Sequence, residues 1–144
     1  MVDDVHPAIA ARLDGDGQRY TSGRRALVEV LVDAGRPLTA AEVVVEADLS
    51  QSSAYRNLAV LEAAGVVHRI SGTDEFARFE LAEDLTDHHH HHLVCTECGA
   101  ISDFTVPDHL EAAIDALAAG VAERSGFVVE RHRLDLFGRC ATCR

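Results

Sequence analysis

The chain has 144 residues and a formal net charge of −11, and all 13 of its basic residues are arginine. This length is typical of one domain or two small ones, and the 47% of apolar residues can supply a core. No apolar run approaches the ~20 residues needed to cross a bilayer, and the acidic first four residues lack the apolar region of a secretory signal. We therefore expect a cytoplasmic protein with no membrane partner. The charge also argues against nucleic acid, because phosphates repel an acidic surface.

Helical periodicity dominates the first half of the chain. Thr21 and Ser50 are placed to cap helices, and Thr39 and Glu42 have capping-box spacing. Helix, helix and β-hairpin in succession are typical of a winged helix-turn-helix. The predicted elements are a short first helix, helices over 24–34, 39–47 and 50–64, and strands over 66–70 and 76–81.

The second half of the chain predicts a small α/β domain after a polar hinge. We expect strands over 89–95 and 100–104, a helix over 107–124 and a last strand over 127–137. The helix would bury one apolar side, formed by Leu110, Ile114, Leu117 and Val121. The fold class is therefore α+β. The predicted domains are an N-terminal winged helix-turn-helix domain over 1–83, a hinge over 84–87 and a C-terminal domain over 88–144.

The four cysteines form two closely spaced pairs, Cys95/Cys98 and Cys140/Cys143. In a chain without export signals such pairs indicate metal ligands or redox groups before disulfides. Four thiolates around one ion make a closed structural zinc site, and Gly99 suits the backbone reversal that follows. A thioredoxin-like redox pair is the alternative, but it requires a single CxxC in a βαβ setting. We therefore expect structural Zn²⁺ to tie the C-terminal strand to its domain.

Five consecutive histidines, residues 88–92, precede the first cysteine pair. An expression tag would lie at a terminus, whereas a solvated low-complexity patch remains an alternative. Because side chains alternate along a strand, His88, His90 and His92 would face one way and His89 and His91 the other. The run could thus give two imidazoles to each of two metal sites that bind Zn²⁺, Fe²⁺, Mn²⁺ or Co²⁺. Further ligands would come from His68, Glu80, Asp103, Glu111 or His132.

The acidic charge is spread over both halves of the chain. Residues 1–84 hold 8 Arg and 15 acids (−7), and residues 85–144 hold 5 Arg and 9 acids (−4). Any phosphate-binding face must therefore be local, and every cationic side-chain contact in it must be an arginine. The helix before the predicted wing offers small hydroxyls, a ring and a guanidinium, which suit a DNA groove, although such a face is often only solvated. These side chains are Ser52, Ser53, Tyr55 and Arg56.

Several stretches together resemble the ferric uptake regulator family of metal-dependent repressors, over about residues 18–143. Residues 21–24 are similar to the family's T-x-x-R, and residues 53–58 to its recognition-helix motif T-V-Y-R-x-L. The run from His89 to Gly99 is similar to the signature H-H-L-V-C-x-x-C-G, which is highly specific. Further similarity covers 64–67, 79–81 and 140–143.

This resemblance implies a homodimer that pairs through its C-terminal dimerisation domains and binds a palindromic double-stranded DNA operator. Tyr55 and Arg56 would contact the groove and Arg19 the adjacent minor groove. Arg24, which matches the motif arginine, is also expected to bind DNA. The implied regulatory hinge site takes its ligands from the wing region and the histidine strand, and holds Zn²⁺ or Fe²⁺. Its matched residues are His68, Glu80, His90 and His92. A second site in the dimerisation domain would use His89, His91, Glu111 and His132.

The match to the family leaves some ligands and functions open. Pro37 stands where some relatives supply a histidine, and a longer hinge loop means that Glu83 or Asp84 could replace Glu80. Asp103 matches a ligand of the peroxide-sensing branch. The alternative function is therefore a peroxide-sensing repressor that uses iron-catalysed histidine oxidation. A zinc enzyme or a zinc buffer would leave the winged helix unexplained, and we expect neither catalysis nor a small organic substrate.

Overall fold

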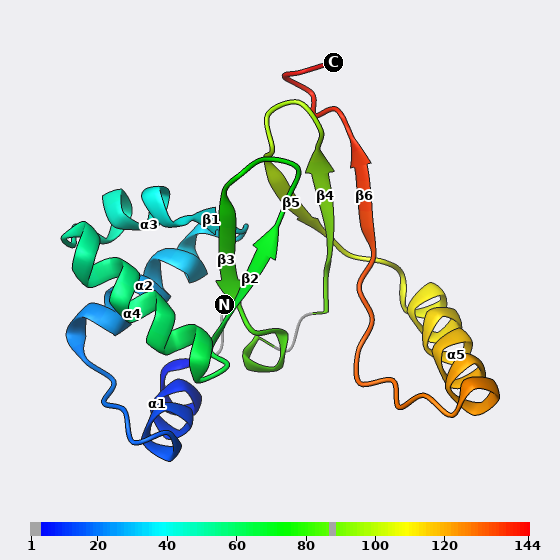
Figure 1. Cartoon of the computed structure of the whole chain (residues 1–144), viewed down its shortest axis with the longest axis horizontal. Coiled ribbons are helices and arrows are strands. Elements are labelled where there is room, and N and C mark those ends of the chain that lie inside the picture. Colours follow the sequence, from blue (N-terminus) through cyan, green and yellow to red (C-terminus); the bar gives the residue numbers. More distant parts are fainter. Residues whose placement is uncertain (1–3, 87–88) are drawn as a thin grey trace.

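A computed structural model describes residues 4–86 and 89–144. Asp87 and His88, from the predicted hinge and histidine run, lie outside the described residues. Figure 1 shows the N-terminal helices on one side of two small sheets and the C-terminal helix on the other. Within the described residues no helix is long and apolar enough to cross a membrane. The elements are α1 (His6–Gly15), α2 (Ser22–Ala34), β1 (Leu38–Thr39), α3 (Ala40–Ala47), α4 (Gln51–Ala63), β2 (Val67–Ser71), β3 (Ala77–Leu81), the 3-10 turn η1 (Glu83–Leu85), β4 (His91–Cys95), β5 (Ile101–Phe104), α5 (Asp108–Ser125) and β6 (Asp135–Gly138).

The N-terminal part confirms the predicted helix starts. Thr21 and Ser50 accept hydrogen bonds from the third residue of their helices, and Thr39 forms a complete capping box with Glu42. The short β1 pairs with β3, so the hairpin becomes a three-stranded antiparallel sheet of order β1-β3-β2. Apolar residues from all four helices and from β2 and β3 form one core. The result is a winged helix-turn-helix with an added first helix.

The C-terminal sheet places the histidine run beside the last strand. β4 lies in the centre, antiparallel to β5 and parallel to β6. The predicted strand over 127–137 is wrong for its first part, since only Asp135–Gly138 is a strand. β4 pairs with β6 from His92 onward, and before Asp135 the pairing continues only through the backbone hydrogen bond from the His92 amide to the carbonyl oxygen of Leu134.

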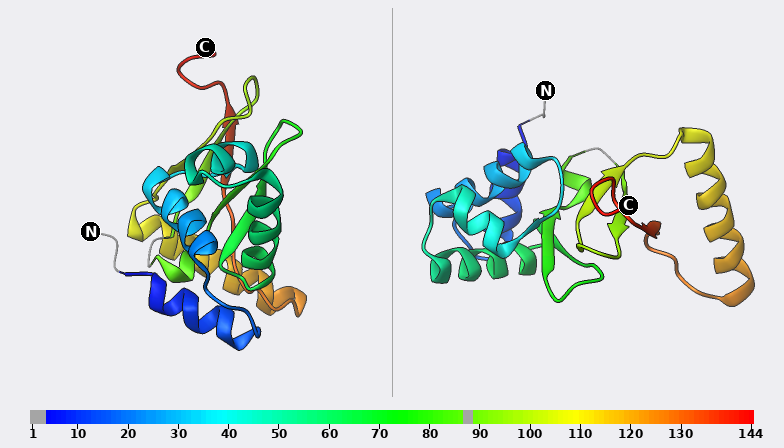
Figure 2. Two further views of the ribbon diagram at one scale, coloured as in Figure 1. Left: turned by 90° about the vertical axis from the view of Figure 1, so that its left-hand side faces the viewer. Right: turned by 90° about the horizontal axis from the view of Figure 1, so that it is seen from above.

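Helix α5 stands apart from this sheet, as the right-hand view of Figure 2 shows. The predicted burial of its apolar side is wrong for the single chain, because no residue of α5 is buried. Leu117 is 65% exposed, Leu110 and Val121 are also exposed, and Ile114 is half-buried. The chain alone does not supply the surface that this side would pack against. The first sheet ends at Leu81 and the second begins at His91, whereas the exact domain bounds 1–83, 84–87 and 88–144 remain a prediction.

Candidate metal centres and nucleic-acid interface

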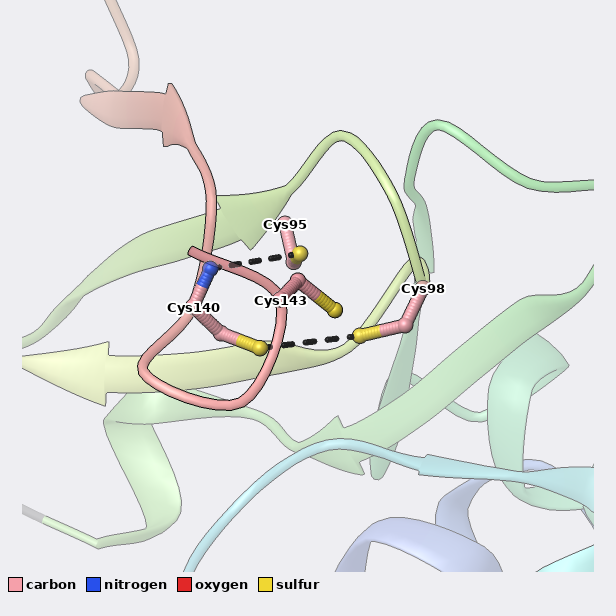
Figure 3. Close-up of side chains that lie close together, drawn as sticks. All are labelled: Cys95, Cys98, Cys140 and Cys143. Atoms are coloured by element: carbon pink, nitrogen blue, oxygen red, sulfur yellow. Dashed lines mark hydrogen bonds between the residues drawn. The ribbon is translucent and has the colours of Figure 1, made fainter.

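The four cysteines converge at one end of the C-terminal sheet. Cys95 ends β4, Cys98 follows in the next turn, and Cys140 and Cys143 lie in the turn after β6. All four sulfurs lie within 4.8 Å of one another, and none forms a disulfide. Figure 3 shows the side chains pointing inward from the two turns. This donor set is the one that structural zinc prefers.

Backbone amides prepare two of these thiols for deprotonation. The amides of Cys98, Cys140 and Glu97 lower the pKa of Cys95 to about 6, and the Cys140 amide donates to its Sγ over 3.3 Å. Hydrogen bonds from Cys143 likewise lower the pKa of Cys140. The thiolate is the metal-binding form of cysteine, so these hydrogen bonds favour the required charge state at Cys95 and Cys140. The neighbouring sulfurs of Cys140 and Cys98 instead raise the pKa of Cys143 to about 12, and the charge of a bound cation would offset that rise. The residues therefore fit a zinc ion.

A second group of donors lies between the two sheets. Glu80 on β3 reaches across to β4, where its two carboxylate oxygens lie 2.9 Å from the Nε2 atoms of His90 and His92. Asp103 on β5 pairs in register with His92, and its oxygens lie 3.7 Å from the same two nitrogens. The ligand atoms of all four residues lie within 4.8 Å of one another. The group thus joins the wing of the first domain to the sheet of the second.

The two carboxylates of this group attract positive charge, which protons on the histidines supply here and which a divalent cation would supply by displacing them. Burial opposes ionisation of Glu80, but hydrogen bonds from both histidines outweigh burial and lower the pKa of Glu80 to about 2. The hydrogen bond to Glu80 raises the pKa of His90 to about 9, while burial raises the pKa of Asp103. Asp103 Oδ1 is buried and has no hydrogen-bond partner among the described residues. A cation between the two carboxylates and the two imidazoles would satisfy that oxygen.

A third group lies on the opposite side of β4. His91 Nε2 contacts one oxygen of Glu111 on α5, and His132 Nε2 lies 3.1 Å from the other. His89 Nε2 and His132 Nε2 are 3.0 Å apart. These four predicted residues place their ligand atoms within 4.8 Å of one another. The alternation expected along the run therefore holds for His89 to His92, although the strand itself begins only at His91.

The structure does not bring His68 into the hinge group. The fourth member of the group is Asp103. His68 pairs with Glu80 across the hairpin and lines the same cavity of about 320 Å³. The carboxylate oxygens of Glu80, however, contact His90 and His92, and His68 is not among the residues whose ligand atoms gather there. Of the alternative ligands, Glu83 lies 2.7 Å from His89 Nδ1, and Asp84 forms a 2.7 Å ion pair with Arg12. Sequence spacing could not rank these acids, because the hinge geometry decides which one faces the imidazoles.

The candidate DNA-contacting residues fall on one part of the first domain. Ser52, Tyr55, Arg56 and Arg19 are exposed, with Tyr55 at 49%, and Ser53 is half-buried. Arg24 differs, because its guanidinium donates to the Asn57 side chain over 3.1 Å and to the carbonyl of Arg19. Arg24 therefore braces the segment before α2 against α4. Asn57 in turn donates to Ser53 Oγ, which links this brace to the exposed face.

The wing turn also makes contacts that the sequence did not predict. Asp74 and Arg78 form a two-armed ion pair, with N–O distances of 2.8 and 2.9 Å, and Thr73 bonds the backbone of Cys95. Four-residue spacing is a helical signal and carries no such meaning across a hairpin turn. No pattern in the sequence could have identified these residues.

The structure combines a winged helix-turn-helix domain with a domain that holds a four-cysteine site, and a His/carboxylate cluster joins the two. This combination is typical of metal-dependent DNA-binding regulators. Comparison with known families agrees, since the profile of the Ferric uptake regulator family matches residues 15–137. The chain belongs to the ferric uptake regulator family of metal-dependent transcriptional regulators.

Individual relatives support this assignment. The peroxide-responsive repressor PerR of Staphylococcus aureus is 31% identical over 138 residues, which cover 92% of this chain and 87% of the relative. The manganese-bound ferric uptake regulator of Pseudomonas aeruginosa is 28% identical, with a TM-score of 0.69 and coverage of 91% and 96%. The Helicobacter pylori regulator Fur, described with three functional metal-binding sites, has a TM-score of 0.73 at 24% identity, covering 96% and 91%. This last likeness shows the fold alone.

Proposed function

We propose that the chain is a cytoplasmic repressor that binds a palindromic operator as a homodimer when metal occupies its hinge site. The sensing site consists of Glu80, His90, His92 and Asp103. One observation carries this proposal: a single group of ligand atoms takes Glu80 from the wing and its other members from the C-terminal sheet. A bound cation would therefore act on the relation between the two domains as well as on its own ligands.

The physical basis is a population shift. An ion that holds ligands from both domains binds only conformations in which these ligands converge, so it favours the closed arrangement. Two recognition helices then keep the separation needed for successive major-groove faces of one operator. Without the ion the domains sample arrangements that do not fit DNA. Operator affinity then falls in proportion to the fraction of molecules that remain in the competent arrangement.

The four-cysteine group is assigned to structural Zn²⁺ in this proposal. Two lowered thiol pKa values and the absence of disulfides between the four cysteines support that assignment. The regulatory ion is Zn²⁺ or Fe²⁺, which suit imidazole and carboxylate donors. The group of His89, His91, Glu111 and His132 is a further metal site within the C-terminal domain.

A homodimer accounts for the apolar surface of the C-terminal domain. Leu110, Leu117 and Val121 on α5 are exposed, as are Phe127 and Val128 in the segment that follows. Continuous exposed apolar surface of this kind marks an interface. Pairing of two C-terminal domains would cover it and would set the distance between two recognition helices.

Operator contacts are assigned to the exposed side of α4 and to Arg19. Tyr55 and Arg56 would enter the major groove, with Ser52 and Ser53 near its wall and Arg19 reaching the adjacent minor groove. Arg24 contributes by holding the Arg19 backbone and Asn57 in place. Because the chain carries −11 overall, affinity depends on these few arginines and on dimer geometry.

Mobility-shift titration of the protein on its own upstream region tests the proposal. The protein should shift this DNA with metal added and should fail to do so after a chelator removes the hinge ion. Zinc bound at the four-cysteine site is assayed in both samples, so that unfolding is not mistaken for gating. Equal operator affinity in both samples would refute metal gating.

A second candidate function is a peroxide-sensing repressor, which the 31% identical relative PerR favours. The hinge group holds only nitrogen and oxygen donors, a set that suits Fe²⁺. Hydrogen peroxide would transfer one oxygen atom to a ring carbon of His90 or His92 and leave as water. Mass spectrometry of the iron form after peroxide treatment should then show a gain of 16 Da on the peptide holding these residues. An unmodified peptide and retained operator binding would exclude this function.

A further inference from the structure

The turn of the wing, residues 72–76, lies against the turn that carries Cys95 and Cys98. Thr73 Oγ1 donates a 2.8 Å hydrogen bond to the carbonyl oxygen of Cys95, the last residue of β4. Residues 72–76 are called the wing tip here, and residues 95–99 the cysteine turn. Figure 1 shows the β2–β3 turn reaching the β4–β5 end of the second sheet. The two domains therefore touch at a point beyond the hinge cluster.

Packing at this contact leaves no space for a side chain at Gly99, and Gly72 also lies close to the second domain. A Cβ on Gly99 would overlap the carboxylate of Asp74, so only a hydrogen fits there. A Cβ on Gly72 would lie 3.4 Å from Ile101 Cδ1 and 3.6 Å from the carbonyl oxygen of Gly99. Close approach of two backbones is a recognised use of glycine. The wing tip and the cysteine turn are thus fitted to each other.

Asp74 is held in place by a buried arginine. Arg78 on β3 is only 7% exposed and donates to both oxygens of Asp74. Asp74 also accepts a 3.2 Å hydrogen bond from the amide of Phe76, which fixes the shape of the turn. A two-armed arginine–carboxylate pair gives geometric specificity as well as energy. The pair therefore rigidifies the wing tip in the form that meets Gly99.

An apolar cluster completes the contact. Ile70 on β2 packs with Val94 on β4 and Ile101 on β5, and all three are buried. This cluster is separate from the main core of the winged-helix domain. It lies between the wing tip and the hinge, on the two sheets that the contact joins. Apolar burial across the two domains favours their closed arrangement.

We infer that Thr73, Asp74 and Arg78 are positioning residues that dock the wing on the cysteine turn and thereby preorganise the hinge metal site. Glu80 lies on the same strand as Arg78, two residues further along, and reaches His92 on β4. The docked wing tip fixes one end of β3 against β4 and its turn, so the carboxylate of Glu80 is already aimed at its partners. The four-cysteine site then supports the regulatory site through the wing, in addition to stabilising its own domain.

The inference rests in part on the proposed function, since it assigns the hinge group a metal, but its test needs no operator. Thr73→Val removes only the hydroxyl donor, and Asp74→Asn weakens the ion pair while keeping the shape. The matched control is Glu75→Gln, an exposed position on the same turn. Zinc content and the urea midpoint are measured for each variant, so that loss of the zinc ion from the four cysteines or of global stability is recognised.

The first readout is amide hydrogen exchange in peptides covering the wing tip and the cysteine turn. We expect the double variant Thr73→Val/Asp74→Asn to exchange at least several-fold faster in both peptides, with the rest of the chain unchanged. The second readout is Mn²⁺ affinity of the hinge group, measured with Glu111→Gln in every variant to weaken the other cluster. Because docking and metal binding are linked, the double variant should bind Mn²⁺ about tenfold more weakly. This factor corresponds to the loss of roughly one charge-assisted hydrogen bond.

Three results would overturn the inference. These are wild-type exchange at both turns, faster exchange spread evenly over the chain, or Mn²⁺ affinity equal to that of the Glu75→Gln control. A protein that passes both readouts but ignores operator DNA would refute the proposed repressor and leave the docking contact standing.

Discussion

Replacement of Glu80 by glutamine probes the hinge site at the residue that joins the two domains. The carboxylate lies 2.9 Å from both His90 Nε2 and His92 Nε2, and it is ionised because these contacts lower its pKa to about 2. Glutamine keeps the shape and one oxygen donor but removes the negative charge. Altering the groups that only orient metal ligands weakens binding by about 10- to 100-fold, so the loss of a ligand's own charge should weaken it by at least that range. This factor equals about 1.4–2.8 kcal/mol.

The assay is isothermal titration calorimetry with Mn²⁺ on protein that retains the zinc of its four-cysteine site. Glu111→Gln serves as the matched control, because Glu111 plays the corresponding bridging part in the other cluster. Glu80→Gln should weaken one class of site and raise the metal concentration at which operator binding is half-maximal. Glu111→Gln should weaken the other class and leave that half-maximal concentration nearly unchanged. The opposite result, with metal dependence lost only in Glu111→Gln, would refute the assignment of Glu80 to the sensing site.

Four further predictions concern other parts of the molecule. Arg56→Ala should cost about 1–3 kcal/mol of operator affinity and reduce the salt dependence, as measured by fluorescence anisotropy at several salt concentrations; unchanged affinity would remove α4 from the interface. Leu117→Asp should convert the dimer into a monomer in analytical ultracentrifugation, because it places a charge on the exposed apolar side of α5; a stable dimer would place the interface elsewhere. Cys143→Ser should lower bound zinc and the melting temperature together, and normal zinc content would contradict the assignment of zinc to the four cysteines. Arg78 lowers the pKa of Asp74, so the ion pair should stabilise the fold above about pH 4, and this stabilisation should fade as the pH falls further. The urea midpoint of Asp74→Asn should therefore depend less on pH than that of the wild type. Equal slopes of urea midpoint against pH would contradict this pairing.

The winged helix was predictable because each of its helices carries its own start signal. Thr21, Ser50 and the Thr39/Glu42 box determine local backbone geometry within three residues, and this local chemistry survives in the folded chain. The histidine alternation was predictable for the same reason, since it depends only on the two-residue period of extended backbone. The clusters of His89/His91 and His90/His92 follow directly from that period.

The two predictions that were wrong, the buried side of α5 and the long last strand, depend on neighbouring surfaces that the sequence alone does not reveal. The apolar side of α5 has helical periodicity, but the chain offers it nothing to pack against, so Leu117 remains exposed. The segment before Asp135 has strand-like composition, but a strand also needs a neighbour, and β4 extends only far enough to pair from His92 onward. Amino-acid composition gives a segment a preference for the strand conformation, but a strand forms only where a neighbouring strand is available to pair with it.

The fourth ligand of the hinge site shows the same limit at the level of one side chain. His68 and Asp103 were both candidates, and His68 lies directly opposite Glu80 across the hairpin. In the structure Asp103 joins the group because it pairs with His92 across β4 and β5 and places a carboxylate oxygen within 4.8 Å of the ligand atoms of Glu80 and both histidines. How Glu80 of the first sheet faces β4 and β5 of the second is not encoded in spacing along the chain, so the sequence could offer only the set of candidate ligands.

Operator affinity measured against free metal concentration is the most direct test of metal gating. The zinc-containing protein is titrated onto a labelled fragment of its own upstream region, with buffered Zn²⁺, Fe²⁺ or Mn²⁺ or with chelator. We predict that affinity rises steeply as the group of Glu80, His90, His92 and Asp103 fills, and that Glu80→Gln moves this rise to higher metal concentration. Operator binding that is equally tight with metal and with chelator, while the four cysteines keep their zinc, would contradict the account.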